Sequence, residues 1–213
     1  MDELVYPIKN THLFIISAIS FSLHMATGKI IIITAPSGAG KTSITRYLLN
    51  KYNTLCFSIS AATRQPRGEE KNGVDYYFIS TEDFQQKINE HAFAEWEMVY
   101  EGKYYGTLKS ELERIWQLGK TPVLDIDVKG AIHIQQQYPN QTFSLFIQPP
   151  SVSVLKERLE SRGTETPESI ATRISKAAYE ISFSHSFSTV IVNEDLATAC
   201  KEAEDTIMKF LNR

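Results

Sequence analysis

Short apolar runs alternate along this chain with longer segments in which apolar residues recur every three or four positions. The plainest run is residues 30–33, four consecutive isoleucines with no polar residue among them. Such a β-branched run is typical of a strand that is buried on both faces of a sheet. We expect further core strands at residues 122–127 and 143–147, and a last short strand at residues 190–192.

Helical segments separate these strands. The apolar spacing predicts helices at residues 42–52, 108–118, 128–138, 152–161, 166–183 and 196–213. The sequence Thr166-Pro167-Glu168 combines a threonine cap, a proline at the first helical position and an acid at the positive end of a helix. Regular strand–helix alternation predicts a parallel α/β sheet, and ligands of such sheets lie at the carboxyl ends of the strands.

One region interrupts this alternation with short, hairpin-like strands. They are predicted at residues 55–60, 75–79, 93–100 and 103–106, with the polar residues 63–73 left irregular. The residues Ser80-Thr81-Glu82-Asp83 resemble a capping box that opens a helix. We therefore predict an inserted lobe at residues 57–108, between core segments at 28–56 and 109–213.

Composition narrows the class of protein. The 213 residues suit one domain, and 42% hydrophobic with 22% charged residues is ordinary for a globular chain. A net charge of −3 argues against an extended nucleic-acid surface. The two cysteines, Cys56 and Cys200, lack metal-ligand spacing, and we expect them to be reduced in a cytoplasmic protein. We expect no membrane partner, and a monomer or small homo-oligomer.

The first 24 residues differ from the rest. Residues 12–23 are mostly apolar but too short to span a bilayer, and Asp2 and Glu3 stand where a secretory signal carries positive charge. We interpret Met25 as the natural start and residues 1–24 as an upstream extension or poorly ordered tail. The alternative is an anchoring or packing helix.

The residues that follow the isoleucine run carry the strongest chemical signal. APSGAGKT, residues 35–42, fits the phosphate-loop pattern G-x-x-x-x-G-K-[ST] except that Ala35 replaces the first glycine. Backbone N–H groups of residues 37–40 and of the next helix would bind phosphate oxygens, Lys41 would reach the outer phosphates, and the Thr42 hydroxyl would hold Mg²⁺. The alternative is a glycine-rich turn with one lysine, but the strand–loop–helix context favours a nucleotide loop.

Two acids, Asp125 and Asp127, end a predicted core strand. An acid at this point in nucleotide enzymes orients Mg²⁺ or its waters, although one of the two could instead cap the helix that starts at Val128. Glu95, beside Trp96 on a predicted strand, would need a partner if it is buried.

Five of the eight arginines fall in two short segments. Arg64 and Arg67 share a loop, and Tyr76 with residues 104–107 would add hydroxyl donors to a phosphate pocket. The other three are Arg158, Arg162 and Arg173. They fit either a solvated helix face or a lid that closes arginines onto phosphates. None of the five histidines lies in a catalytic or metal-ligand grouping.

A family resemblance rests on the order of several segments. After APSGAGKT come SISAATRQPRGEEKNGVDYYF, AEW, YYGT, LDIDVKG, LKERLESRGTET and VIVNEDL. In this order they resemble the guanylate kinase family over about residues 28–213. The resemblance implies a P-loop NTPase-type parallel sheet flanked by helices, with a small GMP-binding lobe and a helical lid at about residues 156–175. It also implies transfer of the γ-phosphoryl group of MgATP to GMP, a step in guanine nucleotide metabolism and GMP recycling.

The same resemblance implies roles for individual residues. The residues matched to ATP binding are Ala35, Pro36, Ser37, Gly38, Ala39, Gly40, Lys41, Thr42 and Asn193. Those matched to GMP are Ser60 and Glu95 for guanine, Arg64, Arg67, Tyr76 and Tyr105 for its phosphate, Thr107 near the base, and Asp127. The catalytic group would comprise Lys41, Arg158, Arg162, Arg173 and Asp125, with Thr42 on Mg²⁺ and Asp125 reaching the ion through water. Ala35 and a longer Glu95–Tyr105 spacing depart from the family pattern.

Physical chemistry agrees with a guanine site at Glu95. Guanine presents two donors on one edge, N1–H and the exocyclic amine, and one carboxylate can accept both, whereas adenine presents an acceptor at N1. Such a site rejects the wrong base by roughly 10⁴–10⁵. The second pKa of a phosphate monoester is about 6, so the attacking GMP oxygen is already anionic and no protein base is required. Two alternatives stay open: a non-catalytic peptide-binding module of this fold, and a kinase of another small phosphate compound.

Overall fold

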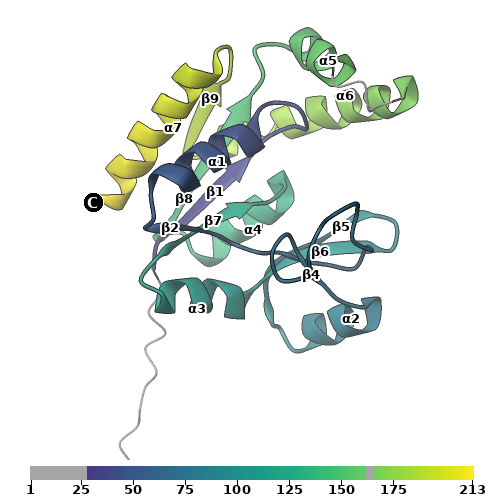
Figure 1. Ribbon diagram of the computed structural model, residues 1–213, viewed down its shortest axis with the longest axis vertical. Helices are drawn as coiled ribbons and strands as arrows, with labels where there is room; N and C mark the ends of the chain where they lie inside the picture. Colours follow the sequence, from purple (N-terminus) through teal and green to yellow (C-terminus); the bar gives the residue numbers. More distant parts are fainter. Residues whose placement is uncertain (1–27, 162–165) are drawn as a thin grey trace, which may run out of the picture.

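A five-stranded parallel sheet forms the centre of the protein (Figure 1). The computed structural model describes residues 28–161 and 166–213. Sheet order is β2-β7-β1-β8-β9, comprising β1 (Ile30–Thr34), β2 (Leu55–Phe57), β7 (Thr121–Asp125), β8 (Thr142–Gln148) and β9 (Thr189–Val192). Every neighbouring pair is parallel, which confirms the predicted α/β class. The interpretation of residues 1–24 lies outside the described residues and stays a prediction.

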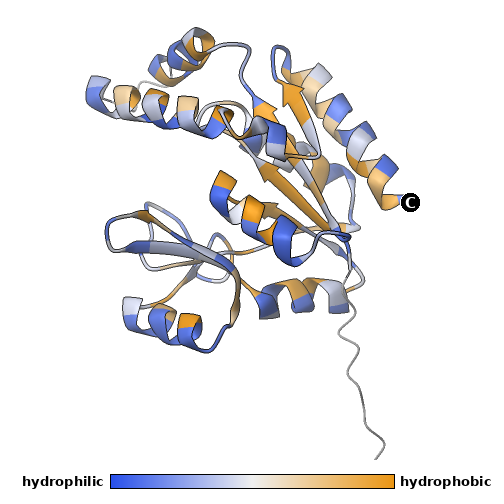
Figure 2. Ribbon diagram, turned by 180° about the vertical axis from the view of Figure 1, so that it is seen from behind, coloured by the Kyte–Doolittle hydropathy of each residue, from blue (hydrophilic) through white to orange (hydrophobic). Residues whose placement is uncertain are grey.

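The isoleucine run lies in the middle strand, and its alternation builds two cores. Ile31 and Ile33 pack under α1 (Lys41–Lys51) and α7 (Leu196–Leu211) on one face. Ile30 and Ile32 pack under α3 (Lys109–Gln117) and α4 (Val128–Gln137) on the other. All four isoleucines are fully buried, because successive side chains of a strand point to opposite faces and both faces carry helices. Figure 2 shows the central strands as a continuous hydrophobic layer.

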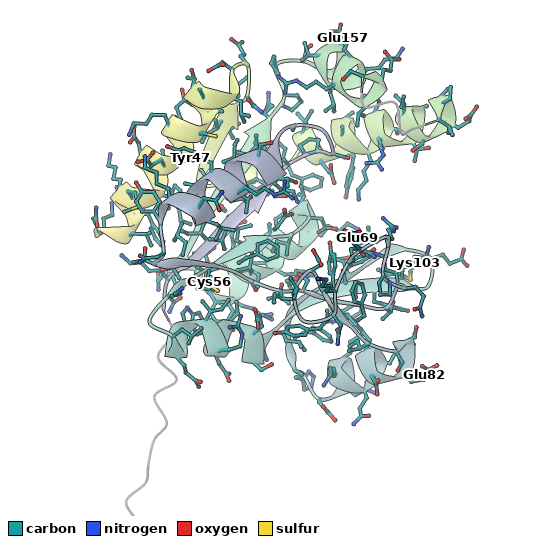
Figure 3. All side chains as sticks on the ribbon, viewed as in Figure 1. Tyr47, Cys56, Glu69, Glu82, Lys103 and Glu157 are labelled. Carbon is teal, nitrogen blue, oxygen red and sulfur yellow. The ribbon has the colours of Figure 1, made fainter. Side chains whose placement is uncertain are left out.

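A carboxylate joins the two helices that cover the first face. Glu204 of α7 accepts hydrogen bonds from Tyr47 Oη at 2.6 Å, Tyr52 Oη at 2.5 Å and Lys51 Nζ at 2.8 Å. Tyr47 lies between α1 and α7 (Figure 3). These contacts hold α1, the helix that follows the phosphate loop, against the C-terminal helix.

Residues between β2 and α3 form a second sheet with one helix, called here the four-stranded unit. Its order is β4-β3-β6-β5, comprising β3 (Ala61–Ala62), β4 (Tyr77–Phe78), β5 (Phe93–Tyr100) and β6 (Lys103–Leu108), with α2 (Thr81–Asn89) against it. Ser80 caps α2 by accepting a hydrogen bond from Asp83 N at 2.9 Å, as predicted. Phe84 of α2 is fully buried, its ring stacked at 4.3 Å from that of Phe93.

Several details of this region differ from the sequence prediction: β4 is shorter than residues 75–79, and β6 continues past residue 106 to Leu108. Strand β2 ends at Phe57 rather than at residue 60, because the Ile59 N–H donates to the Glu111 carboxylate at 3.0 Å and the chain turns away from the central sheet. Strand β3 was missed, since two adjacent buried alanines contain no alternation from which a strand can be read.

Helices α5 (Val152–Glu160) and α6 (Pro167–Ile181) form a pair with its own small core of Leu155, Leu159, Ile170 and Ala177. Thr166 caps α6 as predicted, accepting from Ser169 N at 3.2 Å. A 3-10 turn, η1 (Ser184–Ser186), leads to β9. The pair and the four-stranded unit extend to the same side of the central sheet (Figure 1). None of the described helices is long and apolar enough to cross a membrane.

Candidate active site

A cavity of about 470 Å³ lies where the central sheet, the four-stranded unit and α6 meet. Most predicted site residues line it, although they come from distant parts of the chain. They are Ala35, Pro36, Ser37, Gly38, Gly40, Lys41, Thr42, Ser60, Arg64, Arg67, Tyr76, Glu95, Tyr105, Asp125, Asp127 and Arg173. The structure thus brings the loop, the two acids and the arginine–tyrosine group to one cavity.

The loop between β1 and α1 has the backbone that its glycines predict. Gly38 and Gly40 have φ angles of 96° and 104°, in the region that favours glycine, and Gly40 is the N-cap of α1. The first N–H groups of a helix have no acceptor within the helix and favour anions. Among the described residues, His91 is the only non-glycine residue with a positive φ, so the φ of Ala35 is not positive. Alanine therefore replaces the first glycine of the pattern without backbone strain.

Asn193 supports the loop from behind and does not line the cavity. The residue is 4% exposed, and its Nδ2 donates to the carbonyl of Ala39 at 2.7 Å. Ala39 is itself fully buried. Arg158 also lies behind the loop. It donates a hydrogen bond to the Asn193 carbonyl at 2.9 Å and does not line the cavity. Arg162 lies outside the described residues, and α5 ends before it at Glu160.

Gly40→Ala should destabilise the protein more than Gly119→Ala. Both glycines have positive φ, where alanine costs about 1–2 kcal/mol. A Cβ at Gly40 would also collide with Asn193 Nδ2 and disturb its bond to Ala39, at a further cost of about 1–3 kcal/mol, whereas nothing lies within 4 Å of one at Gly119. Free energies of unfolding from urea titration measure the difference. Equal losses for the two variants would show that Asn193 does not restrain the loop.

The two acids after β7 have different surroundings. The Asp125 carboxylate contacts the Lys41 amine in an ion pair, both side chains being about three-quarters buried. Asp127 is the N-cap of α4, and its Oδ1 accepts from Gly130 N at 2.9 Å, so the capping alternative holds for this residue. Both still line the cavity.

Arg64 is a cation of the cavity wall that three hydrogen bonds hold in place. Its Nε donates to Tyr105 Oη at 3.0 Å, and its two terminal nitrogens bind Glu70 at 2.5 and 2.8 Å. The bonds from Arg64 lower the pKa of Glu70 to about 2. The Tyr76 ring lies 4.8 Å from the guanidinium carbon. Sequence reasoning missed Glu70, since a pair six residues apart in an irregular loop follows no helix or strand spacing.

Glu95 is a buried carboxylate on the cavity wall. The residue is 6% exposed, and its Oε1 accepts from Thr107 Oγ1 at 2.6 Å, which supplies the partner that burial requires. Burial raises the pKa of Glu95 to about 7. Thr107 is fully buried behind it and does not line the cavity. A Cβ on Gly130 would come within 2.5 Å of Glu95 Oε2, so this glycine makes room for the carboxylate.

Helix α6 contributes residues that sequence reasoning overlooked. The Arg173 guanidinium contacts the Ser37 hydroxyl of the loop. Lys176 and Glu180, three and seven residues further on, also line the cavity, as do Ser43, Glu97, Val99, Gly106 and Ile126. The helical spacing from Arg173 could have identified the first two. Glu97 could have been found from Glu95, because residues two apart lie on one strand face.

The oxygen donors on this wall suit Mg²⁺. The Thr42 hydroxyl and the Asp125 carboxylate line the same cavity, and both are the hard ligands that Mg²⁺ prefers. Among the described residues no group of three or more His, Cys, Asp or Glu could hold a metal by itself. The donor set therefore fits an ion that takes most of its ligands from phosphate oxygens and water, as Mg²⁺ does with nucleotides.

Comparisons with known proteins agree with this geometry. A sequence profile of the guanylate kinase family matches residues 27–210. The chain is 47% identical to a guanylate kinase of Bacteroides thetaiotaomicron, over 91% of this chain and 95% of that relative. It is also 47% identical to a guanylate kinase of Porphyromonas gingivalis, over 86% and 98%. The crystal structure of guanylate kinase from Anaplasma phagocytophilum matches with a TM-score of 0.70 at 29% identity, over 87% of each chain. The chain belongs to the guanylate kinase family.

Proposed function

We infer that this protein transfers the γ-phosphoryl group of ATP to GMP and releases ADP and GDP. One observation carries the inference: a buried carboxylate, Glu95, shares a single cavity with the phosphate loop at residues 35–42. The carboxylate suits a guanine edge, and the loop suits a polyphosphate. In this proposal the core comprises residues 28–56 and 109–213, the GMP-binding lobe residues 57–108, and the lid about residues 156–175.

The loop and the start of α1 would bind ATP. Backbone N–H groups around Gly38 and Gly40 would bind its phosphates, and Lys41, oriented by Asp125, would reach the outer ones. Thr42 and Asp125 would hold Mg²⁺, which when bound neutralises charge on the phosphates. Asn193 would act by fixing the Ala39 carbonyl and so the shape of the loop.

The four-stranded unit would bind GMP. Arg64, fixed by Glu70 and Tyr105, would bind the GMP phosphate together with Arg67 and Tyr76. Glu95 would accept the two guanine donors, with Ser60 beside it on the wall and Thr107 orienting the carboxylate. Adenine would place an acceptor against the same carboxylate and leave a buried charge unpaired.

Transfer needs position and charge neutralisation rather than a protein base. The GMP phosphate is anionic at neutral pH, and the residues that line the cavity include no histidine. Lys41, Arg64 and Arg173 would bring two anions together in line and stabilise the charge that spreads over the transferred group. Closure of the α5–α6 pair would exclude water that could hydrolyse ATP.

A coupled assay of ADP release tests the function. Purified protein with MgATP should release ADP rapidly with GMP and at least about 10⁴-fold more slowly with AMP, as expected for a hydrogen-bonded base site. CMP and UMP should be equally poor substrates. Release with AMP at a rate similar to that with GMP, or none with GMP, would contradict the proposal.

The KM for GMP should fall about 20-fold between pH 6 and pH 8, roughly tenfold of it from Glu95 and about twofold from the GMP phosphate. The pKa of Glu95 is about 7, so about one-tenth of the protein carries the carboxylate at pH 6 and about nine-tenths at pH 8. Only the ionised form accepts both guanine donors, and binding therefore strengthens as pH rises. Glu95→Gln is the control: it should retain only the roughly twofold change that comes from the GMP phosphate, whose second pKa is about 6. An unchanged KM in the wild type would contradict an ionised Glu95 in the complex.

We also propose a cytoplasmic location. Its support is the pair of thiols: Cys56 and Cys200 are both free, and Cys200, a residue of α7, is buried in the core. Unpaired cysteines of this kind are typical of proteins kept in a reducing compartment.

A further inference from the structure

Helix α6 presents three charged residues to the cavity at helical spacing. Arg173, Lys176 and Glu180 are separated by three and four positions, so they lie on one face of the helix, and all three line the cavity. The Arg173 end of this row contacts the phosphate loop through Ser37. The row therefore runs along the cavity from the loop toward the remaining walls.

Lys176 occupies the middle of this row. It also lines an adjoining hollow of about 140 Å³, together with Glu97 and Val99 of β5 and Asp127 at the start of α4. Lys176 thus lies between two parts of the cavity. One is the loop, which would hold ATP. The other is the wall formed by Asp127 and by β5, the strand of Glu95, and this wall would hold GMP. A cation in this position faces the space between the two nucleotides.

Glu180 is placed to orient the Lys176 amine. Its side chain is only 10% exposed, and its Oε1 lies 3.7 Å from Lys176 Nζ. This distance exceeds that of a hydrogen bond, so Glu180 attracts the amine by charge and leaves its three N–H donors for another acceptor. Burial raises the pKa of Glu180, whereas Arg64 lowers that of Glu70. Glu180 also holds the amine less closely than Glu70 holds Arg64, whose two bonds measure 2.5 and 2.8 Å.

Resting on the function inferred above, we propose that Lys176 is a further catalytic residue, which binds the phosphoryl oxygens between ATP and GMP, and that Glu180 positions it. ATP and GMP together bring several negative charges into one cavity. Two of its cations, Lys41 and Arg64, already have carboxylate partners in Asp125 and Glu70. Lys176 adds a positive charge between the loop and the wall of Asp127 and β5, where charge would spread during transfer.

The test compares Lys176→Met and Lys176→Arg with the wild type in the ADP-release assay. Methionine keeps the stem but removes the charge, and it should lower kcat by about 10- to 100-fold. This is somewhat less than the 10²–10³ lost with a fully preorganised donor, because the Lys176 side chain is 46% exposed. The KM for ATP should stay within about twofold, and the arginine variant should recover most of kcat. A lysine with only a structural role would change the melting temperature instead.

Lys201→Met is a matched control. Lys201 of α7 also pairs with an acid four residues later, Asp205 at 2.8 Å, but it is outside the lid and the residues that line the cavity. Its kcat should equal that of the wild type. Glu180→Gln should lower kcat several-fold, and adding it to Lys176→Met should cause little further loss, since the two act through one amine.

The outcomes separate this inference from the function on which it rests. A wild type that phosphorylates GMP, with Lys176→Met within twofold of its kcat, would overturn the role of Lys176 alone. Fully additive losses in the double variant would overturn the positioning role of Glu180. A wild type that releases no ADP with GMP would overturn the proposed function itself, and this inference with it.

Discussion

Lys41→Ala should abolish GDP formation while the protein stays folded. Lys41 would be the cation of the phosphate loop, and removing a preorganised charge from a transition state costs about 10²–10³ in kcat or more. The fold should survive, because the lysine is a quarter exposed and its partner Asp125 has similar access to solvent. The measurements are the rate of ADP release with GMP and the melting temperature.

The matched control for this variant lies on the same helix. Arg46 of α1 is exposed and does not line the cavity, so Arg46→Ala should retain the wild-type rate. Near-normal turnover of Lys41→Ala would remove the loop from the mechanism. A loss of both rate and melting temperature in Lys41→Ala would instead indicate that the Lys41–Asp125 pair maintains the fold.

Glu95→Gln should weaken the use of GMP far more than that of ATP. The carboxylate would accept two guanine donors, and each hydrogen bond to a charged acceptor contributes about 1.5–3 kcal/mol. A glutamine presents one carbonyl and one NH₂ group, so at least one guanine donor would face another donor. We expect kcat/KM for GMP to fall about 10²–10⁴-fold, with the KM for ATP unchanged. Kinetics with GMP and AMP measure the change in base preference.

The melting temperature of Glu95→Gln distinguishes a loss of guanine recognition from a loss of folded protein. The folded pKa of Glu95, about 7, lies above the ordinary glutamate value of 4.5, so its stabilising contribution is complete below pH 4.5 and is lost as pH rises through 7. At pH 8 the wild type therefore carries the cost of a buried charge, and Glu95→Gln should melt at the same or a higher temperature. Glu101→Gln, on the exposed turn of the same hairpin, should change neither property. An unchanged GMP/AMP ratio in Glu95→Gln would show that guanine is read elsewhere.

Local chemistry explains why much of the fold could be predicted. The isoleucines at 30–33 formed a buried strand because every position carried a β-branched apolar side chain. The Ser80 and Thr166 caps form within three residues of the chain, and their hydrogen bonds do not depend on distant packing. Strand β3, by contrast, depends on pairing with β4 and β6, and two alanines carry no signal of it.

Contacts between distant residues limited what could be predicted of the site. Arg64, Tyr76 and Tyr105 were expected near one phosphate, and they do meet on the cavity wall, but Glu70 was absent from that expectation. Arg158 and Asn193 were expected near nucleotides, yet they contact each other and the back of the loop. These differences arise because a side chain binds whatever partner the backbone path brings within about 3 Å, and sequence spacing does not encode that path.

The sequence by itself determined the parallel α/β class and indicated the phosphate loop, since both follow from side-chain type and short-range spacing. Its family resemblance pointed to the candidate guanine carboxylate. Only the tertiary structure decided that Asp127 caps a helix, that Glu95 is buried against Thr107, and that Lys176 faces the cavity. The physical reason is that burial, charge pairing and pKa depend on which surfaces pack together. Those surfaces meet here through contacts between distant segments, such as the one between Ser37 of the loop and Arg173 of α6, which are 136 residues apart.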